Sequence, residues 1–112
     1  MKRLLLLPLL LLVGCGTPEP KEPTPQQLFE VLNEENMELL ELMKGIQAKQ
    51  AKAGNRCLDY ETLTAAMDMS SAKWGAMGVV LERMGDLTEA VQAKATQRKL
   101  SSVSARVRRQ CR

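Results

Sequence analysis

An unbroken series of apolar and small residues at three- and four-residue spacing, between Tyr60 and Met84, constrains this chain most. Its members are Tyr60, Leu63, Met67, Ser70, Trp74, Met77, Leu81 and Met84. This spacing puts them all on one face of an α-helix about 25 residues long. Asp59 precedes the series as a candidate N-cap, and Gly85 follows it as a helix end. A break near Ser70 and Ser71 is the alternative to one continuous helix.

A second helix is predicted before this segment. Thr24 as N-cap, Pro25 in the first turn and Gln27 as capping-box partner give its start. Gly54, which tolerates the left-handed conformation, ends it after about Ala53. The apolar stripe of this helix consists of Leu28, Leu32, Leu39, Met43, Ile46 and Ala53, is widened by Leu40 and Leu42, and is broken by Asn36 and Gln50.

A third helix is predicted from Asp86, its N-cap, to the C-terminus, with Glu89 in the first turn. Its stripe is thinner and consists of Leu87, Ala90, Ala93, Leu100, Val103 or Ser104, and Val107. The connections are short, so residues 26–112 predict an all-α domain, a three-helix up-down-up antiparallel bundle. Small residues beside the central stripe, Ser71, Gly75 and Gly78, would let one neighbour approach closely.

Two of the three cysteines fall at one end of such a bundle. Cys57 lies in the first connection, and Cys111 lies at the end of the third helix. We therefore expect a disulfide between Cys57 and Cys111, as an oxidising compartment allows. Two unpaired thiols are the alternative.

The N-terminus carries a targeting signal. Lys2 and Arg3 precede an apolar segment, Leu4 to Val13, which is too short to span a bilayer and is typical of a secretory signal peptide. The run Leu12-Val13-Gly14-Cys15 resembles the lipobox of bacterial lipoprotein precursors. The resemblance implies cleavage of residues 1–14 and lipidation of Cys15, whose several acyl chains hold a protein permanently in a membrane. Gly16 stands where enterobacterial lipoproteins retained in the inner membrane have aspartate, so the resemblance favours the periplasmic face of the outer membrane.

Residues 15–25 are predicted to be a tether between the lipid and the bundle. They contain Pro18, Pro20, Pro23 and Pro25. Proline at this density favours extended polyproline II structure, at ~3.1 Å per residue, and holds the domain roughly 25 Å or more from the lipid headgroups.

The composition excludes most catalytic sites. The chain has no histidine, so Ser-His-Asp and Cys-His sites are impossible, and a zinc site has no imidazole ligand. We expect no enzymatic activity, no cofactor and no metal. The formal net charge of +3 includes Lys2 and Arg3, which leave with the leader, so a nucleic-acid partner is not indicated.

Methionines are frequent and have two functional interpretations besides core packing. A methionine-rich stripe can bind copper(I) or form an adaptable groove for a peptide. The methionines in question are Met37, Met43, Met67, Met69, Met77 and Met84. They follow the same helical faces as the leucines, which favours packing over metal. The third helix has too few large apolar residues to cover the first two, which favours a groove for a partner helix.

Charge is segregated along the predicted bundle. Acids gather at the tethered end: Glu30, Glu34, Glu35, Glu38, Glu41, Glu82, Asp86 and Glu89. Bases gather at the far end: Lys44, Lys49, Lys52, Arg56, Arg106, Arg108, Arg109 and Arg112. Compensation of helix dipoles explains this pattern for the first and third helices. The functional alternative is a basic tip, formed by Lys49, Lys52, Arg56, Arg106, Arg108 and Arg109, that binds an anionic partner.

Together these features predict a non-enzymatic, membrane-anchored envelope lipoprotein that acts as a protein-binding adaptor or assembly factor. This general plan is similar to that of the α-helical pilotins, which escort secretin subunits to the outer membrane. The alternative is a structural lipoprotein that contacts the cell wall through the basic tip. Such contact would be non-covalent, because the chain ends in Arg112 and lacks the C-terminal lysine of the major murein lipoprotein.

Overall fold

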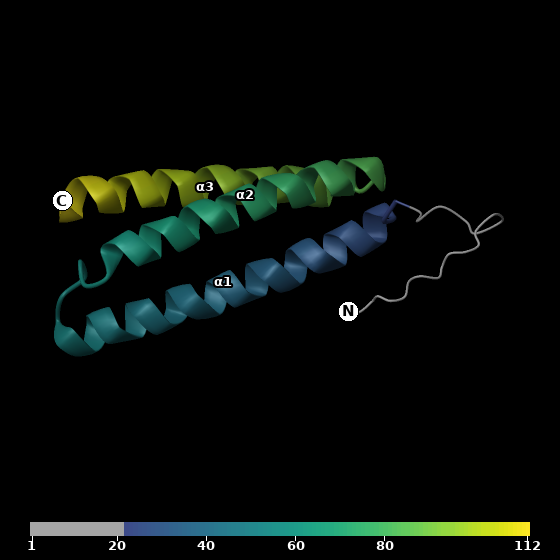
Figure 1. The fold of residues 1–112 in the computed structure, drawn as a ribbon. Helices are drawn as coiled ribbons and strands as arrows, with labels where there is room; N and C mark the ends of the chain where they lie inside the picture. The colour runs from purple at the N-terminus through teal and green to yellow at the C-terminus, as the bar shows by residue number, and fades with distance from the viewer. Residues whose placement is uncertain (1–21) are drawn as a thin grey trace, which may run out of the picture.

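The computed structural model describes residues 22–112, which form three helices (Figure 1). These are α1 (Pro25–Ala53), α2 (Tyr60–Arg83) and α3 (Leu87–Cys111). α1 and α3 run in the same direction and α2 runs back between them, so the predicted all-α, up-down-up bundle is confirmed. Within residues 22–112, no helix combines the length and the apolar character needed to cross a bilayer.

The leader and its cleavage site lie outside the described residues. This holds for the predicted signal peptide, residues 1–14, for Cys15, and for the tether up to residue 21. The bundle itself begins at the predicted N-cap. The Thr24 hydroxyl accepts a hydrogen bond from the Gln27 backbone N–H at 3.1 Å, and the Gln27 side chain accepts one from the Thr24 N–H at 2.9 Å. Two otherwise unsatisfied N–H groups are thereby paired.

The other helix ends follow the sequence with one difference. Gly54 adopts φ 65° at the end of α1, and the Asp86 carboxylate accepts from the Glu89 N–H at the start of α3. Asp59 does precede α2, but it has φ 56° and its side chain makes no capping hydrogen bond. α2 continues through Ser70 without interruption, so the predicted alternative of a break there is wrong.

The core consists of two apolar clusters along α2. Met43, Ile46, Leu63, Ala66 and Met67 form the cluster nearer the first connection. The second cluster, nearer the tethered end, contains Leu81, Ala90 and Ala93, with Phe29 and Trp74 packed against it. The central stripe and the thin α3 stripe are therefore confirmed over most of their length.

Four stripe residues were predicted wrongly. Leu42, predicted to widen the α1 stripe, is 46% exposed, because it lies beside the exposed Met69 at the surface between α1 and α2. Met84 is 41% exposed and Leu87 is 63% exposed, because they flank the tight connection between α2 and α3 at the end of the bundle, where no helix lies beyond them. Ala53 is exposed in the last turn of α1, where the chain leaves the bundle.

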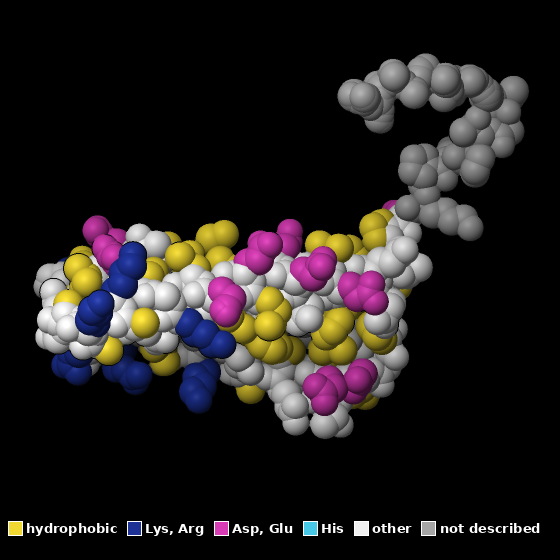
Figure 2. All heavy atoms as spheres, turned by 90° about the horizontal axis from the view of Figure 1, so that it is seen from below, with side chains coloured by type: hydrophobic (Ala, Val, Ile, Leu, Met, Phe, Trp, Pro, Cys, Tyr) yellow, Lys and Arg dark blue, Asp and Glu magenta, His cyan; other side chains and the backbone are white. Residues whose placement is uncertain are grey.

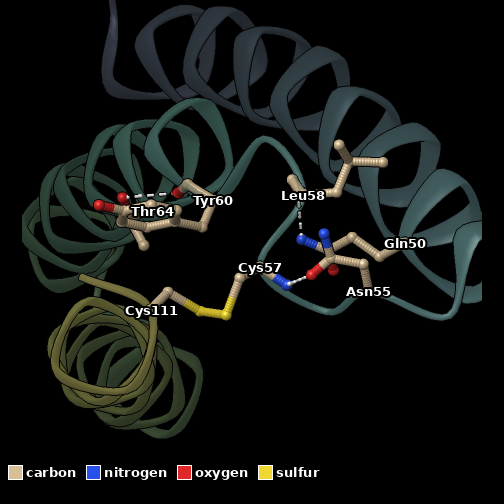
Figure 3. The surroundings of a disulfide bond; sticks show 7 residues. All are labelled: Gln50, Asn55, Cys57, Leu58, Tyr60, Thr64 and Cys111. Atoms are coloured by element: carbon tan, nitrogen blue, oxygen red, sulfur yellow. Dashed lines mark hydrogen bonds between the residues drawn. A yellow bond between two sulfur atoms is a disulfide. The ribbon is translucent and has the colours of Figure 1, made fainter.

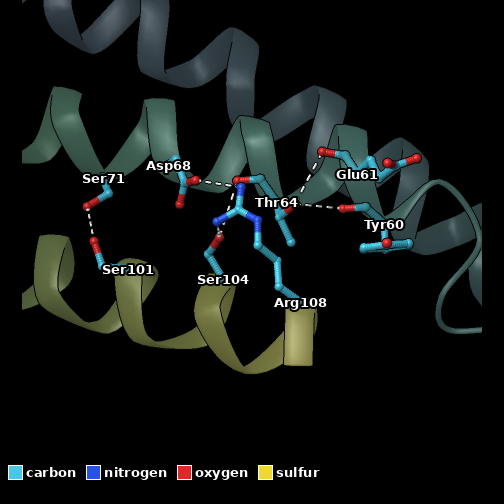
Figure 4. Close-up of polar contacts among 8 residues, drawn as sticks. All are labelled: Tyr60, Glu61, Thr64, Asp68, Ser71, Ser101, Ser104 and Arg108. Atoms are coloured by element: carbon cyan, nitrogen blue, oxygen red, sulfur yellow. Dashed lines mark hydrogen bonds and ion pairs between the residues drawn. The ribbon is translucent and has the colours of Figure 1, made fainter. Parts of the chain in front are cut away.

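α2 and α3 approach each other closely, as the small residues of α2 predicted. An added Cβ at Gly75 would lie 2.6 Å from Nε2 of Gln97, and one at Gly78 would lie 3.0 Å from Cγ of Lys94. Beside these glycines, the Ser71 hydroxyl lies 2.8 Å from that of Ser101 (Figure 4). It also donates a hydrogen bond to the Gln97 carbonyl at 2.9 Å. Hydrogen bonds between side chain and backbone therefore accompany this contact.

A buried polar pair joins α1 to α2 between the two apolar clusters. The Ser70 hydroxyl donates to Oδ1 of Asn36 at 2.5 Å, and both residues are at most 1% exposed. An axial slip of one helix against the other would leave both groups buried without this partner, at a cost of about 1–3 kcal/mol each. Asn36, which interrupts the apolar stripe of α1 in the sequence, thus fixes the register of α1 on α2.

The predicted Cys57–Cys111 disulfide closes the far end of the bundle (Figure 3). The two Cα atoms lie 5.4 Å apart. The connection that carries Cys57 is itself ordered by two hydrogen bonds: the Cys57 N–H donates to the Asn55 side chain at 3.0 Å, and the Gln50 side chain donates to the Leu58 carbonyl at 2.7 Å. Gln50, the other polar interruption of the α1 stripe, therefore fastens the connection to α1.

Replacing Cys111 with serine should lower the free energy of unfolding by about 4 kcal/mol, because the disulfide closes a loop with a sequence separation of 54 residues. Chemical denaturation of the variant and the wild type measures the difference. Mass-spectrometric mapping of alkylated cysteines should find neither Cys57 nor Cys111 reactive in the denatured, unreduced wild type. Reactive thiols at both positions would contradict the pairing.

Candidate functional site

A groove runs between α1 and α3, with α2 as its floor. Both α1 and α3 pack against α2, but in the described part of the chain no Cα atom of α1 lies within 8 Å of a Cα atom of α3. Figure 1 shows α1 and α3 on either side of α2. We call this hollow the α1–α3 groove; it is the candidate functional site.

The half of the groove nearer the disulfide is the larger and the more apolar. It has a volume of about 440 Å³. Met67 and Trp74 of α2 form its floor. Its walls are Leu40, Met43, Lys44 and Gln47 of α1 and Thr96, Lys99, Leu100 and Val103 of α3. Apolar side chains at the bottom and polar ones at the rim give this half the character of an incomplete core.

The half nearer the tethered end has a volume of about 240 Å³. Trp74 and Thr96 line both halves, so the two hollows are neighbours along the bundle. Met77 and Leu81 continue the floor, and Phe29 and Asn33 form the α1 wall. The single tryptophan of the chain therefore stands at the middle of the groove and is only partly buried.

The polar part of the α3 wall was not anticipated in the sequence. It consists of Glu89, Gln92, Thr96 and Lys99, which recur at the three- and four-residue spacing of a core stripe beside the predicted stripe residues Ala93, Leu100 and Val103. The sequence feature that could have predicted this wall is the regular spacing of these polar residues beside the thin apolar stripe. Such spacing places them in a row along one face of the helix. The sequence did predict that α3 would leave apolar surface of the other helices uncovered.

Charges at the groove rim change sign along its length. Lys44 and Lys99 line the half nearer the disulfide, one on each wall. Among residues 22–112, Glu89 is the one charged residue that lines the half nearer the tethered end. The groove lining thus carries two lysines in one half and a glutamate in the other.

The disulfide brings both parts of the predicted basic tip to one end of the molecule. Lys49 and Lys52 lie in the last turns of α1, and Arg56 is next to Cys57. Arg106, Arg108 and Arg109 lie in the last turns of α3, just before Cys111. On the face that Figure 2 shows, basic side chains gather toward this end and most acidic ones toward the tethered end.

Arg108 is the one tip residue that forms an ion pair within residues 22–112. Its guanidinium donates to Asp68 at 2.7 Å and to the Ser104 hydroxyl at 3.2 Å, and Ser104 donates to the Thr64 carbonyl (Figure 4). These contacts fasten α3 to α2. Burial acts to raise the pKa of the Asp68 carboxyl, but Arg108 and Ser104 outweigh it and hold this pKa below its ordinary value of 3.8.

The methionines are divided between the core and the surface. Met43, Met67 and Met77 are at most 5% exposed, whereas Met37 and Met69 are more than half exposed. Among residues 22–112, no three His, Cys, Asp or Glu side chains group so that they could hold a metal ion.

Comparison with family models, with curated proteins and with solved structures finds no match for this chain.

Asp68→Asn should lower the free energy of unfolding at neutral pH by less than about 1 kcal/mol, because both side chains of the ion pair are more than 40% exposed. A carboxyl whose pKa is lower in the folded state stabilises the fold above its unfolded-state pKa, and this contribution is lost as pH falls through the folded-state pKa. Wild type and variant should therefore converge below about pH 4. Urea unfolding at several pH values tests this, with Glu61→Gln as the matched control; a difference that persists in acid would contradict it.

Proposed function

We propose that this protein is a non-enzymatic, lipid-anchored adaptor or assembly factor of the bacterial envelope, which binds a partner protein in the α1–α3 groove. The observation that carries the proposal is the groove itself. Trp74, Leu40 and Leu100 are only partly buried and leave apolar surface open to solvent along it. An apolar groove rimmed by polar groups has the character of a binding site for a ligand or a partner.

The sequence supports the anchor. The signal segment and the lipobox-like run ending at Cys15 place the chain at a membrane, and the proline-rich tether would hold the bundle away from the lipid. The acid-rich end of the bundle is the end that follows the tether. The periplasmic face of the outer membrane is the proposed location.

The chemistry of the groove supports binding rather than catalysis. Thr96 is the one hydroxyl residue of its lining, and no imidazole or thiol stands beside it to act as a base. The chain contains no histidine, and Cys57 and Cys111 are used in the disulfide. The adaptor therefore needs no cofactor.

The basic tip supports a second candidate function, contact with the anionic cell-wall polymer. Lys49, Lys52, Arg56, Arg106 and Arg109 are all exposed. Within residues 22–112 none of these five is engaged in an ion pair. They lie at the end opposite the tether, where they would face away from the membrane.

Cys15→Ala should abolish incorporation of a fatty-acid probe and release the protein from the membrane fraction, because the thiol at Cys15 is the site of acylation. Metabolic labelling followed by fractionation of the envelope measures both effects. Cys57→Ser serves as a control for loss of a cysteine. Equal labelling of the wild type and the Cys15 variant would contradict the anchor.

A photo-crosslinking residue placed at Thr96, inside the groove, should capture one discrete envelope protein in living cells. The same residue at Arg98, exposed on α3 and not part of the groove lining, should not capture it. Mass spectrometry of the crosslinked band gives the readout. The same yield at both positions, or none at Thr96, would contradict an adaptor that works through the groove.

The cell-wall alternative predicts a different pattern. The protein would then co-sediment with purified sacculi in a salt-sensitive way, and Arg56→Glu, Arg106→Glu and Arg109→Glu together would abolish this. Arg108 is left unchanged because it fastens α3 to Asp68. If the co-sedimented fraction changes neither with salt concentration nor in the triple variant, the alternative is ruled out.

A further inference from the structure

The three helices occupy three of the four positions of an up-down-up-down bundle. In such a bundle adjacent helices touch and diagonal helices do not. α2 packs against α1 and against α3, whereas the latter two have no Cα atoms within 8 Å of each other. α1 and α3 are thus the diagonal pair. The groove between them lies at the position that a fourth helix would fill.

The length of the groove suits a helix of about five turns. Along α1 its lining extends from Phe29 to Gln47, which is ~27 Å at 1.5 Å rise per residue. Both walls are rows of side chains at helical spacing, into which the ridges of another helix can pack. An apolar floor with polar rims calls for an occupant with one apolar stripe and two charged flanks.

The rim charges set the direction of that helix. An occupant antiparallel to α1 and α3 begins near Lys44 and Lys99 and ends near Glu89. Acids in its first half would then face Lys44 and Lys99, and bases in its second half would face Glu89. This is also the distribution that stabilises a helix against its own dipole.

We infer that the α1–α3 groove takes one amphipathic helix of another envelope protein, antiparallel to α1 and α3, with its acidic N-terminal half beside Lys44 and Lys99 and its basic C-terminal half beside Glu89. The helix completes a four-helix bundle and covers Trp74.

A second copy of this chain is the competing occupant, and the tether argues against it. α1 and α3 carry acidic residues in their first halves and basic residues in their last turns. A second copy would therefore place one of these helices in the groove of the first copy, antiparallel to the groove walls. Its tethered end would then lie beside the far end of the first copy. α1 has 29 residues and is ~43 Å long, whereas the chain from Cys15 to Pro25 spans at most ~35 Å. Two copies that stand upright on one membrane could not pair in this way; this step rests on the proposed lipid anchor.

The test uses the full chain, purified from a producing cell into lipid nanodiscs, and a synthetic peptide as probe. The peptide has about 18 residues, a leucine stripe, glutamates in its first half and lysines in its second half, and no tryptophan. Because Trp74 is the only tryptophan and lines both halves of the groove, its fluorescence should shift to the blue as the peptide covers it. A scrambled peptide of the same composition, which has no stripe, should cause no shift.

Charge reversal at the rim gives the matched comparison. Lys44→Glu with Lys99→Glu should weaken peptide binding by about tenfold at low salt, and less at high salt. The control, Lys49→Glu with Arg98→Glu, makes the same charge change on the same two helices outside the groove lining. It should leave binding unchanged. Circular dichroism of both variants should match the wild type, since all four side chains are exposed.

The orientation is measured with a nitroxide at the peptide N-terminus. It should broaden the amide signals of residues 99–103 and not those of residues 89–93. Broadening of residues 89–93 instead, equal weakening by both double variants, or no shift of Trp74 emission would each overturn the inference. So would a Trp74 shift that depends on protein concentration without peptide, which would show a second copy in the groove. Equal fatty-acid labelling of the wild type and of Cys15→Ala would overturn the anchor alone and leave the peptide measurement valid.

Discussion

The rest of this structure depends on the close contact between α2 and α3. Gly75 and Gly78 remove the side chains that would hold the helices apart, and Ser71 bonds to the Gln97 carbonyl at the same surface. A small contact surface buries little apolar area, so the gain comes from dispersion over many close atoms and from satisfied hydrogen bonds. α3 is committed to this face of α2 and to Asp68 through Arg108. It is therefore not free to move toward α1.

α1 packs on α2 under a different constraint. Its larger side chains, Met43 and Ile46, meet Leu63 and Met67, and the pair of Asn36 and Ser70 fixes the register within this apolar surface. The disulfide then holds the end of α3 against the connection that follows α1, so both outer helices are fixed at the far end. Two different packing modes on a single central helix leave the outer helices apart. The groove is the space between α1 and α3. The core is incomplete along it because these two helices do not pack against each other.

Much of the fold could be predicted from local patterns. Predictions succeeded for features that depend on neighbouring residues in the sequence and failed for features that depend on the packing of other helices. Thr24, Gly54 and Asp86 mark helix ends through interactions within a few residues, so they are legible in sequence. Asp59 precedes α2 but makes no capping hydrogen bond. Its backbone is left-handed, with φ 56°, whereas an N-capping residue usually has an extended backbone. Met84 is the last residue of the α2 stripe and Leu87 the first of the α3 stripe, and both are exposed because no neighbouring helix covers that end of the bundle. The periodicity of a sequence does not show where a neighbouring helix ends.

The sequence by itself determined the three helices, their order, the meeting of Cys57 and Cys111, and the shortage of apolar residues on α3, because spacing and short connections fix these features. Only the tertiary structure decided which helices touch. That choice depends on side chains far apart in the sequence, such as Gly75 against Gln97 and Asn36 against Ser70. It turned polar residues such as Thr96 and Lys99 into the wall of a groove and placed Trp74 at its centre. Whether a helix face is part of the core or lines a groove depends on the helix that packs against it. The sequence of one helix does not show which helix that is.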